Sequence, residues 1–353
     1  MKVLLRRSPY LVFYWEGDNL VIQNYLSHVT VAAEPIVLSL LGFFDRPRPA
    51  SELVASIAAE QKGAILRAVD KLTQHTLLER FDAVARTRER AMSSWNRWGV
   101  EARLFHWATK DVNFICPEEV KSFDEARKRD SPAPSAFKRY PGAHRIQLPP
   151  AKRNLLVKFT DVLHARRTQR DFDGRPITLG ELATLLGLTW GVSRWIDSPT
   201  FGRIGLKTSP SGGAWHPVEV YVAVHNVRGL KQGLYHYSPD MHQLHVLRSG
   251  RVKHHAEAFC PGQWWTKYAG ALFIMTALFE RTMWLYGFSR ALRNIYLEAG
   301  HLCQTFCLTA TALNLAPFCT AALADSMIER EIGLDGIRES VLYVAAVGRV
   351  RST

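Results

Sequence analysis

Hydrophobic and polar positions follow two regular periods from about residue 151 onward. Alternating or continuous apolar runs, which are typical of strands, occur at 218–225, 233–237, 243–247, 271–278 and 341–347. Apolar residues recur every three to four positions, as in helices, at 160–167, 178–190, 251–259, 290–313 and 326–333. The strands on either side of Asp240 predict a hairpin. The pattern therefore predicts one domain of mixed helices and strands over 151–353.

The first 85 residues carry a shorter pattern. Two strand-like runs surround a Glu-Gly-Asp-Asn turn within 9–25. Three short helices are expected near 33–44, 49–59 and 63–78, where proline, serine and apolar spacing give start signals. We therefore expect a small winged-helix-like module over 1–85.

Residues 86–150 are rich in Arg, Lys, Pro and Trp. The stretch KRDSPAPSAFKRYPGAHRIQLPP contains too many prolines to hold a helix or a strand for long. We therefore expect a linker, or an arm that wraps over another surface. No internal repeat is found in the sequence.

The composition is that of an ordinary globular protein, with 353 residues, of which 47% are hydrophobic and 22% charged. No apolar run reaches the roughly 18 residues that a membrane helix needs. The N-terminal sequence has the pattern of neither a signal peptide nor a transit peptide. We therefore expect a cytoplasmic protein without a membrane partner.

The formal net charge of +13 suits an anionic ligand such as a nucleic acid, an acidic peptide or a phosphate. A basic, solvated surface accounts for most of these charges equally well. The helix that would read DNA in a winged-helix protein, AILRAVDKLTQHTLLER, carries mixed charge and no basic stripe. We therefore expect no nucleic-acid partner.

The five cysteines are Cys116, Cys260, Cys303, Cys307 and Cys319. Their number is odd, and no Cys-x-x-Cys occurs. Cys303 and Cys307 are four residues apart in an apolar helical stretch, where buried thiols behave as small hydrophobic groups. The pattern predicts reduced, structural cysteines and no metal site.

Two segments carry groups that suit a phosphate. Arg166, Arg167, Thr168 and Arg170 lie near the end of a short helix, and Arg349 and Arg351 follow an apolar strand. Guanidinium groups form charge-assisted, bidentate hydrogen bonds with phosphate oxygens. Taken alone, the first segment also fits an exposed helix end, and the second a basic tail.

Two further segments are rich in small residues. Pro210, Ser211, Gly212 and Gly213 precede a strand, and a bare backbone there leaves room for a flat ring system. The stretch LNLAPFCTAALAD, at 313–325, follows the long helix and could also pass close to a planar ligand. The glycine motifs of dinucleotide-binding and P-loop proteins are absent from the sequence.

In their order along the chain these segments resemble the nitroreductase-like flavoproteins, and in particular the SagB-type dehydrogenase branch. The segments that carry the resemblance are ARRTQRDF (165–172), PSGGAWHPVEVYV (210–222), GLYHYSPDMHQLHVL (233–247), LEAGHLCQTFCLTATAL (297–313) and VLYVAAVGR (341–349). The resemblance covers roughly 151–350 and implies an α+β fold with a central, mainly antiparallel sheet flanked by helices. The 1–85 module is similar to the winged-helix domains that recognise leader peptides.

The resemblance implies FMN as the cofactor and a homodimer, since FMN sites of this fold lie at a dimer interface. It assigns the phosphate to Arg166, Thr168 and Arg170, with Arg167 as a lesser candidate and Arg349 or Arg351 closing from the C-terminus. The segment from Pro210 through Ser211 and Gly212 to Gly213 would lie against the flavin. Ala321 stands where the family usually has a glycine whose N–H meets flavin N5.

The chain departs from the azoline-oxidising members at RTMWLYG (281–287). Those members commonly have Lys-Tyr-Gly, where this chain has Leu285, Tyr286 and Gly287. Tyr286 is therefore the expected catalytic proton acceptor, and His216, beside the glycine turn, is the substitute candidate. The pair Lys267-Tyr268 comes too early in the chain and is expected on the surface.

The resemblance thus implies an FMN-dependent oxidoreductase of natural-product maturation that dehydrogenates a peptide-borne or carrier-tethered residue, such as an azoline to an azole. Other enzymes of a modification complex are possible partners. Leu285 keeps open a different dehydrogenation or a reduction. A non-catalytic peptide-binding scaffold is the alternative from another class.

Overall fold

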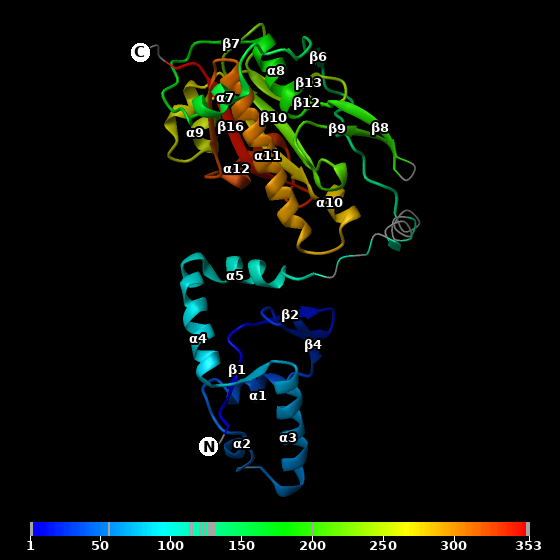
Figure 1. The fold of residues 1–353 in the computed structure, drawn as a ribbon, viewed down its shortest axis with the longest axis vertical. Helices are drawn as coiled ribbons and strands as arrows, with labels where there is room; N and C mark the ends of the chain where they lie inside the picture. The colour runs from blue at the N-terminus through cyan, green and yellow to red at the C-terminus, as the bar shows by residue number, and fades with distance from the viewer. Residues whose placement is uncertain are drawn as a thin grey trace. The chain divides into compact units, whose positions relative to one another are not determined.

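The chain folds as two compact units, Met1–Asn113 and Phe114–Thr353 (Figure 1). The computed structural model describes residues 3–55, 57–112, 131–198 and 201–350, together with residues 114, 116, 118, 119, 122 and 125. Within this described part, no helix combines the length and the apolar character that a membrane crossing requires.

The first unit combines a meander of three strands with a strand pair and several helices. Its elements are β1 (Leu5–Arg7), β2 (Leu11–Glu16), β3 (Asn19–Asn24), β4 (Val29–Ala33), α1 (Ile36–Phe43), α2 (Ala50–Ala55), α3 (Ala59–Gln74) and β5 (Leu78–Arg80). β3 pairs with β2 and β4, and β1 pairs with β5. Ile22, Leu41 and Phe44 are fully buried between these elements. The two strands and three helices expected from the sequence are present, and β4 and the β1–β5 pair add to them.

The first unit continues beyond residue 85. Helix α4 (Ala83–Met92), a 3₁₀ turn (Ser93–Trp98) and α5 (Gly99–Ala108) occupy residues where the sequence pattern predicted a linker. Asp82 caps α4, because its carboxylate accepts a hydrogen bond from the N–H of Ala85 at 2.9 Å. Arg6 of β1 pairs with Glu79 at 2.9 Å and with Glu89 of α4 at 2.8 Å. The ion pair with Arg6 thus stabilises α4 through a residue that is distant in the sequence.

The second unit is built on a seven-stranded sheet with the strand order β15-β16-β14-β10-β12-β13-β6. The strands are β6 (Arg145–Gln147), β10 (Val218–Val224), β12 (Gly233–Ser238), β13 (Gln243–Ser249), β14 (Ala271–Leu278), β15 (Ala316–Thr320) and β16 (Glu339–Gly348). Every neighbouring pair is antiparallel. The α+β class and the central antiparallel sheet agree with the expectation.

Helices cover both faces of this sheet. They are α7 (Phe159–Ala165), α8 (Leu179–Thr189), α9 (Lys253–Phe259), α10 (Phe279–Leu285), α11 (Ala291–Ala312) and α12 (Asp325–Ile332). Alternate residues of β14 enter two apolar layers: Phe273 packs with α8 and α11, and Ile274 with α9 and α12. Trp190, at the end of α8, stacks on Phe273 with ring centroids 5.7 Å apart. The long helix α11 is therefore fixed against the sheet along its buried face.

Residues 131–147, which we call the arm, lie along the second unit. β6 of the arm pairs with β13. Lys138 donates to the Tyr221 hydroxyl at 2.7 Å and forms an ion pair with Glu339 of β16. The Ser135 carbonyl accepts a hydrogen bond from Arg281 Nε at 2.9 Å. These contacts hold the proline-rich segment against β13, β10, β16 and α10.

Candidate functional site

The Pro-Ser-Gly-Gly segment forms a tight turn against helix α10. Gly213 has φ +64°, a conformation that side-chain-bearing residues rarely adopt. A Cβ atom at Gly213 would collide with Leu285 and lie 3.2 Å from the hydroxyl oxygen of Tyr286. A Cβ at Gly212 would lie 3.6 Å from the Tyr286 ring. Gly213 is therefore needed for its conformation and for close packing, whereas Gly212 makes ordinary contacts, and the turn and Tyr286 lie together.

His216 closes the turn and is buried beneath it. Its backbone N–H donates to the hydroxyl of Ser211 at 3.0 Å, and its carbonyl accepts from Arg281 at 3.0 Å. Its Nδ1 lies 3.9 Å from a carboxylate oxygen of Glu298 on α11. Burial, with the positive charges of Lys207 and Arg281, lowers the pKa of His216 to about 2. His216 is therefore neutral at neutral pH and accepts a proton poorly.

A buried ionic network holds the backbone of His216 in place through Arg281. Arg281 of α10 pairs with Glu219 of β10 at 2.7 Å, and Glu219 also contacts His236 Nε2 at 2.7 Å. Burial alone would raise the pKa of Glu219, but the charge of Arg281 and the hydrogen bond from His236 hold it well below its usual value. Glu219 is therefore a carboxylate, although it is almost fully buried.

Lys207 is a site residue that the sequence reasoning missed. Burial lowers the pKa of its ammonium group, while the nearby carboxylates Glu219 and Glu298 partly oppose this. On Glu298 itself, burial raises the pKa. The one available signal in the sequence was that Lys207 stands shortly before the Pro-Ser-Gly-Gly segment, and a lone lysine there is not informative.

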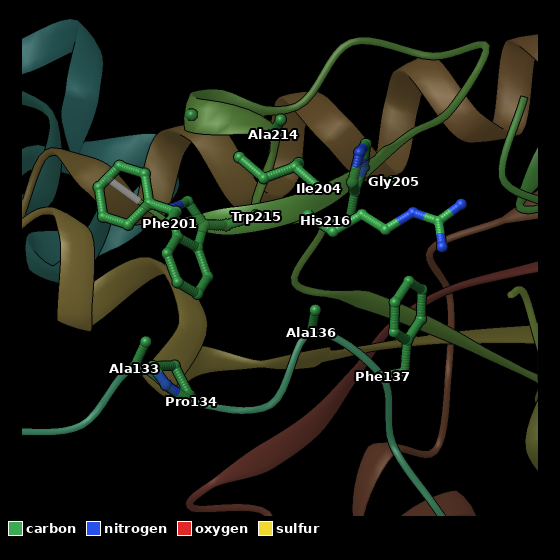
Figure 2. A pocket seen from close by; sticks show the side chains of 12 residues that line it. Ala133, Pro134, Ala136, Phe137, Phe201, Ile204, Gly205, Ala214, Trp215 and His216 are labelled. Atoms are coloured by element: carbon green, nitrogen blue, oxygen red, sulfur yellow. The ribbon is translucent and has the colours of Figure 1, made fainter. Parts of the chain in front are cut away.

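A cavity of about 210 Å³, which we call the turn pocket, opens beside this turn. Its walls come from the turn, the arm and the hairpin of β8 (Arg194–Ser198) and β9 (Gly202–Leu206). The lining residues are Ala133, Pro134, Ala136, Phe137, Phe201, Arg203, Ile204, Gly205, Gly213, Ala214, Trp215 and His216. Phe201 and Trp215 meet edge to face at 5.7 Å, across the cavity from Pro134 and Phe137 of the arm (Figure 2). The pocket can hold a flat or apolar group next to His216.

The arginine segment after α7 runs beside β15 and the end of β16. The N–H of Gln169 donates to the Pro317 carbonyl at 2.9 Å, and the N–H of Asp173 to the Arg349 carbonyl at 2.9 Å. The two arginine-bearing segments expected at the phosphate are thus neighbours. Arg351 lies outside the described residues.

The arginine side chains have different surroundings. Arg166 is half-buried in a cavity, whereas Arg167 donates to the carbonyls of His164 and Arg166, at 3.0 and 2.7 Å. Arg170 lies over the Phe318 ring, 5.7 Å from its centroid, and Thr168 is exposed beside it. Arg349 forms an ion pair with Glu181 at 2.7 Å. A phosphate at Arg349 would therefore compete with Glu181.

A second cavity, of about 320 Å³, opens between α11, β15 and β16, and we call it the α11 pocket. Its lining residues are Arg166, Tyr296, Ala299, Gly300, Cys303, Gln304, Cys307, Cys319, Ala321, Leu342 and Tyr343. It brings Arg166 and Ala321 together, two residues expected at the FMN. A cavity with a guanidinium group and a wall of small residues fits a flat, anionic cofactor.

The structure therefore places the expected cofactor residues in two groups on either side of α11. Arg166 and Ala321 line the α11 pocket, whereas Gly213 and His216 line the turn pocket. Another face of α11 contacts the turn segment, through the Ser209–Thr305 hydrogen bond of 2.7 Å and the approach of Glu298 to His216.

Comparison with known proteins agrees with this architecture. Residues 163–349 match the model of the nitroreductase family. A Methanocaldococcus jannaschii protein named as a nitroreductase is 35% identical over 204 residues, which are 58% of this chain and 96% of that protein. The trifolitoxin-processing protein TfxB of Rhizobium leguminosarum bv. trifolii is 33% identical over 148 residues, 40% of this chain and 39% of TfxB.

A solved structure has the same fold. The crystal structure of an Anabaena variabilis protein named as a nitroreductase has a TM-score of 0.52 and 25% identity, and the match covers 69% of this chain. This chain spans about half of that protein, 49% of its length. The family match extends over more than half of the present chain and includes Arg166, Arg170 and Arg349, the glycine turn and every strand of the sheet except β6. The protein belongs to the nitroreductase family.

Proposed function

We propose that this protein is an FMN-dependent oxidoreductase of natural-product maturation, which dehydrogenates a peptide-borne or carrier-tethered residue such as an azoline. The observation that carries the proposal is the turn at Gly212 and Gly213, packed against Tyr286 beside an aromatic pocket, in a chain of the nitroreductase family. The similarity to a trifolitoxin-processing protein supports a peptide substrate.

Because the two groups lie on opposite faces of α11, one FMN would be held by the α11 pocket of one protomer and the glycine turn of its partner. Arg166 and Arg170 would bind the phosphate with Thr168, and the small residues at Ala321 and Gly213 would let the backbone approach the ring. When bound, FMN supplies the acceptor for a hydride, and the protein supplies binding, orientation and electrostatics. The positive charge of Arg166 favours an anionic group in the α11 pocket.

The turn pocket would hold the substrate group and exclude water from it. Phe201, Trp215 and Phe137 offer apolar ring surfaces on opposite sides of the cavity. Tyr286, whose hydroxyl lies at the Gly213 turn, would accept the proton that leaves the substrate carbon in its ionised, phenolate form. Leu285 carries no proton to exchange, and His216 is too weak a base, so Tyr286 is the group proposed for this step.

We propose that the first unit binds the substrate peptide. Strand β2 exposes three successive aromatic side chains, Phe13, Tyr14 and Trp15, the last of them 63% exposed. Exposed aromatic side chains are frequent in surfaces that recognise other chains. Other enzymes of a modification complex are the expected partners. Since Leu285 replaces the usual lysine, a different dehydrogenation or a reduction is the second candidate function.

The cofactor assignment is tested with the full-length protein. Replacement of both Arg166 and Arg170 by Ala should release FMN, because each lost charge-assisted contact weakens binding by roughly 10- to 150-fold. The flavin-to-protein ratio after desalting, and an FMN titration of the apoprotein, measure the effect. The matched control is Arg338→Ala, since Arg338 is exposed and pairs only with nearby Asp335 in the structure described. A wild-type protein that binds no flavin would refute the function, and stoichiometric flavin in the double variant would refute the phosphate assignment.

A further inference from the structure

Three cysteines from two elements meet at the α11 pocket. Cys303 and Cys307 are one turn apart on α11, and Cys319 comes from β15. Their three sulfur atoms all lie within 4.8 Å of one another. The sequence pattern predicted only structural thiols, because no Cys-x-x-Cys occurs and Cys303 and Cys307 lie in an apolar helical stretch.

These thiols face a cavity, although Cys303 and Cys307 are themselves buried. All three line the α11 pocket, which is open to solvent, and Cys319 is only partly buried. Cys260, by contrast, is fully buried in the apolar layer beneath α9 and α12. An ion that enters the α11 pocket can therefore reach three sulfur atoms at once.

We propose that Cys303, Cys307 and Cys319 form a binding site for one thiophilic metal ion, with the fourth coordination position open to the pocket. Three thiolates and one open position are a ligand set that Zn²⁺ and Cu⁺ accept. Zn–S bonds of about 2.3 Å in a tetrahedral site place sulfur atoms roughly 3.8 Å apart. To reach this distance from their present separations of up to 4.8 Å, the sulfur atoms must move by about 1 Å. Small rotations of the cysteine χ1 angles provide such movements.

Charge selects between the two ions. Three thiolates with Zn²⁺ carry one net negative charge, and the guanidinium of Arg166 in the same pocket offsets it. With Cu⁺ the site would keep an additional negative charge, which is costly where two of the ligands are buried. Zn²⁺ is therefore the favoured ion. The inference does not rest on the proposed flavin chemistry, but FMN would occupy the same pocket, so Zn²⁺ should bind to the flavin-free protein.

The test uses flavin-free, full-length protein, kept reduced by a phosphine. Wild-type protein should bind one Zn²⁺ per chain in competition with a chromogenic chelator. Cys319→Ser and Cys303→Ser should each weaken binding by about 100-fold or more, since loss even of groups that only support a ligand costs about 10- to 100-fold. Cys116→Ser is the matched control, because Cys116 is exposed and away from the three sulfur atoms in the described structure. It should bind Zn²⁺ like wild type.

Two further measurements keep the outcome unambiguous. Zn²⁺ should raise the melting temperature of wild type and of Cys116→Ser but not of Cys319→Ser, which also reports whether that variant is folded. A parallel titration with Cu⁺ decides between the ions. Wild type that binds neither ion, Cys319→Ser that binds Zn²⁺ as tightly as wild type, or a disulfide among these cysteines in the reduced preparation would each overturn the proposal.

Discussion

Tyr286 is the residue on which the proposed proton transfer depends most. Its hydroxyl lies against the Gly213 turn, whereas the preceding Leu285 has no proton to exchange. Tyr286→Phe should therefore keep FMN bound and photoreducible, while reduction of the flavin by the true substrate slows by roughly 10²- to 10⁴-fold. Stopped-flow absorbance of the flavin measures this rate, and Leu285→Lys should remain active.

The control for this experiment is Tyr268→Phe, because Tyr268 is partly exposed in the 3₁₀ turn Trp264–Tyr268 and should not affect the rate. If Tyr286→Phe reduces its flavin at the wild-type rate, the base lies elsewhere. Lys207→Met would then be compared with Lys231→Met, since Lys231 is exposed. His216 is the weaker choice because its pKa is lowered to about 2.

At the scale of elements, Arg281 joins α10 to β10, the turn segment and the arm. It pairs with Glu219 and donates to the carbonyls of His216 and Ser135. Arg281→Met should lower the free energy of unfolding by about 3–5 kcal/mol, because Glu219 is left buried without its cation. Chemical denaturation at pH 7 measures the loss, and the exposed ion pair of Arg338 makes Arg338→Met the control, with little change expected.

The loss of unfolding free energy in Arg281→Met should become smaller as the pH falls. Arg281 keeps the pKa of Glu219 depressed, so this carboxylate contributes stability above the pKa it has in the unfolded chain and loses it as the pH falls. The deficit of Arg281→Met should therefore shrink from pH 7 toward pH 4, where a protonated Glu219 no longer needs a cation. A deficit that stays constant over this range would contradict the electrostatic account.

At the scale of the whole molecule, an exposed apolar surface predicts self-association. Helices α7 and α11 pack together and expose Phe159, Leu163, Tyr296 and Leu297, of which Leu297 is 60% exposed. We expect a homodimer at micromolar concentration, visible by light scattering, and Leu297→Glu should shift it toward monomer. Met241→Glu is the control, because Met241 is similarly exposed at the β12–β13 turn, and it should leave the molar mass measured by light scattering unchanged. A flavin-loaded wild-type monomer would refute this prediction.

The sequence predicted most of the second unit, because its strands and helices carry strong apolar periods. The expected helix at 290–313 is α11 at Ala291–Ala312, and the expected strand at 271–278 is β14. The elements and contacts that the sequence did not predict depend on residues that are distant in the chain. Helices α4 and α5 form in a basic segment that long-range ion pairs stabilise, and the β8–β9 hairpin lacks a clear apolar alternation. The pairing of Arg349 with Glu181 and the approach of Cys319 to α11 are likewise invisible without the fold.

The two edges of the seven-stranded sheet have a consequence for how this protein behaves at high concentration. An open strand edge is a template on which other chains can add strands and polymerise. At one edge, β6 is three residues long and is soon followed by two prolines, Pro149 and Pro150. At the other, Pro317 interrupts the row of amide donors on β15, and its carbonyl is already bonded to Gln169. Because the arginine segment and the arm lie at these edges, we expect little edge-to-edge association of the sheet at high concentration.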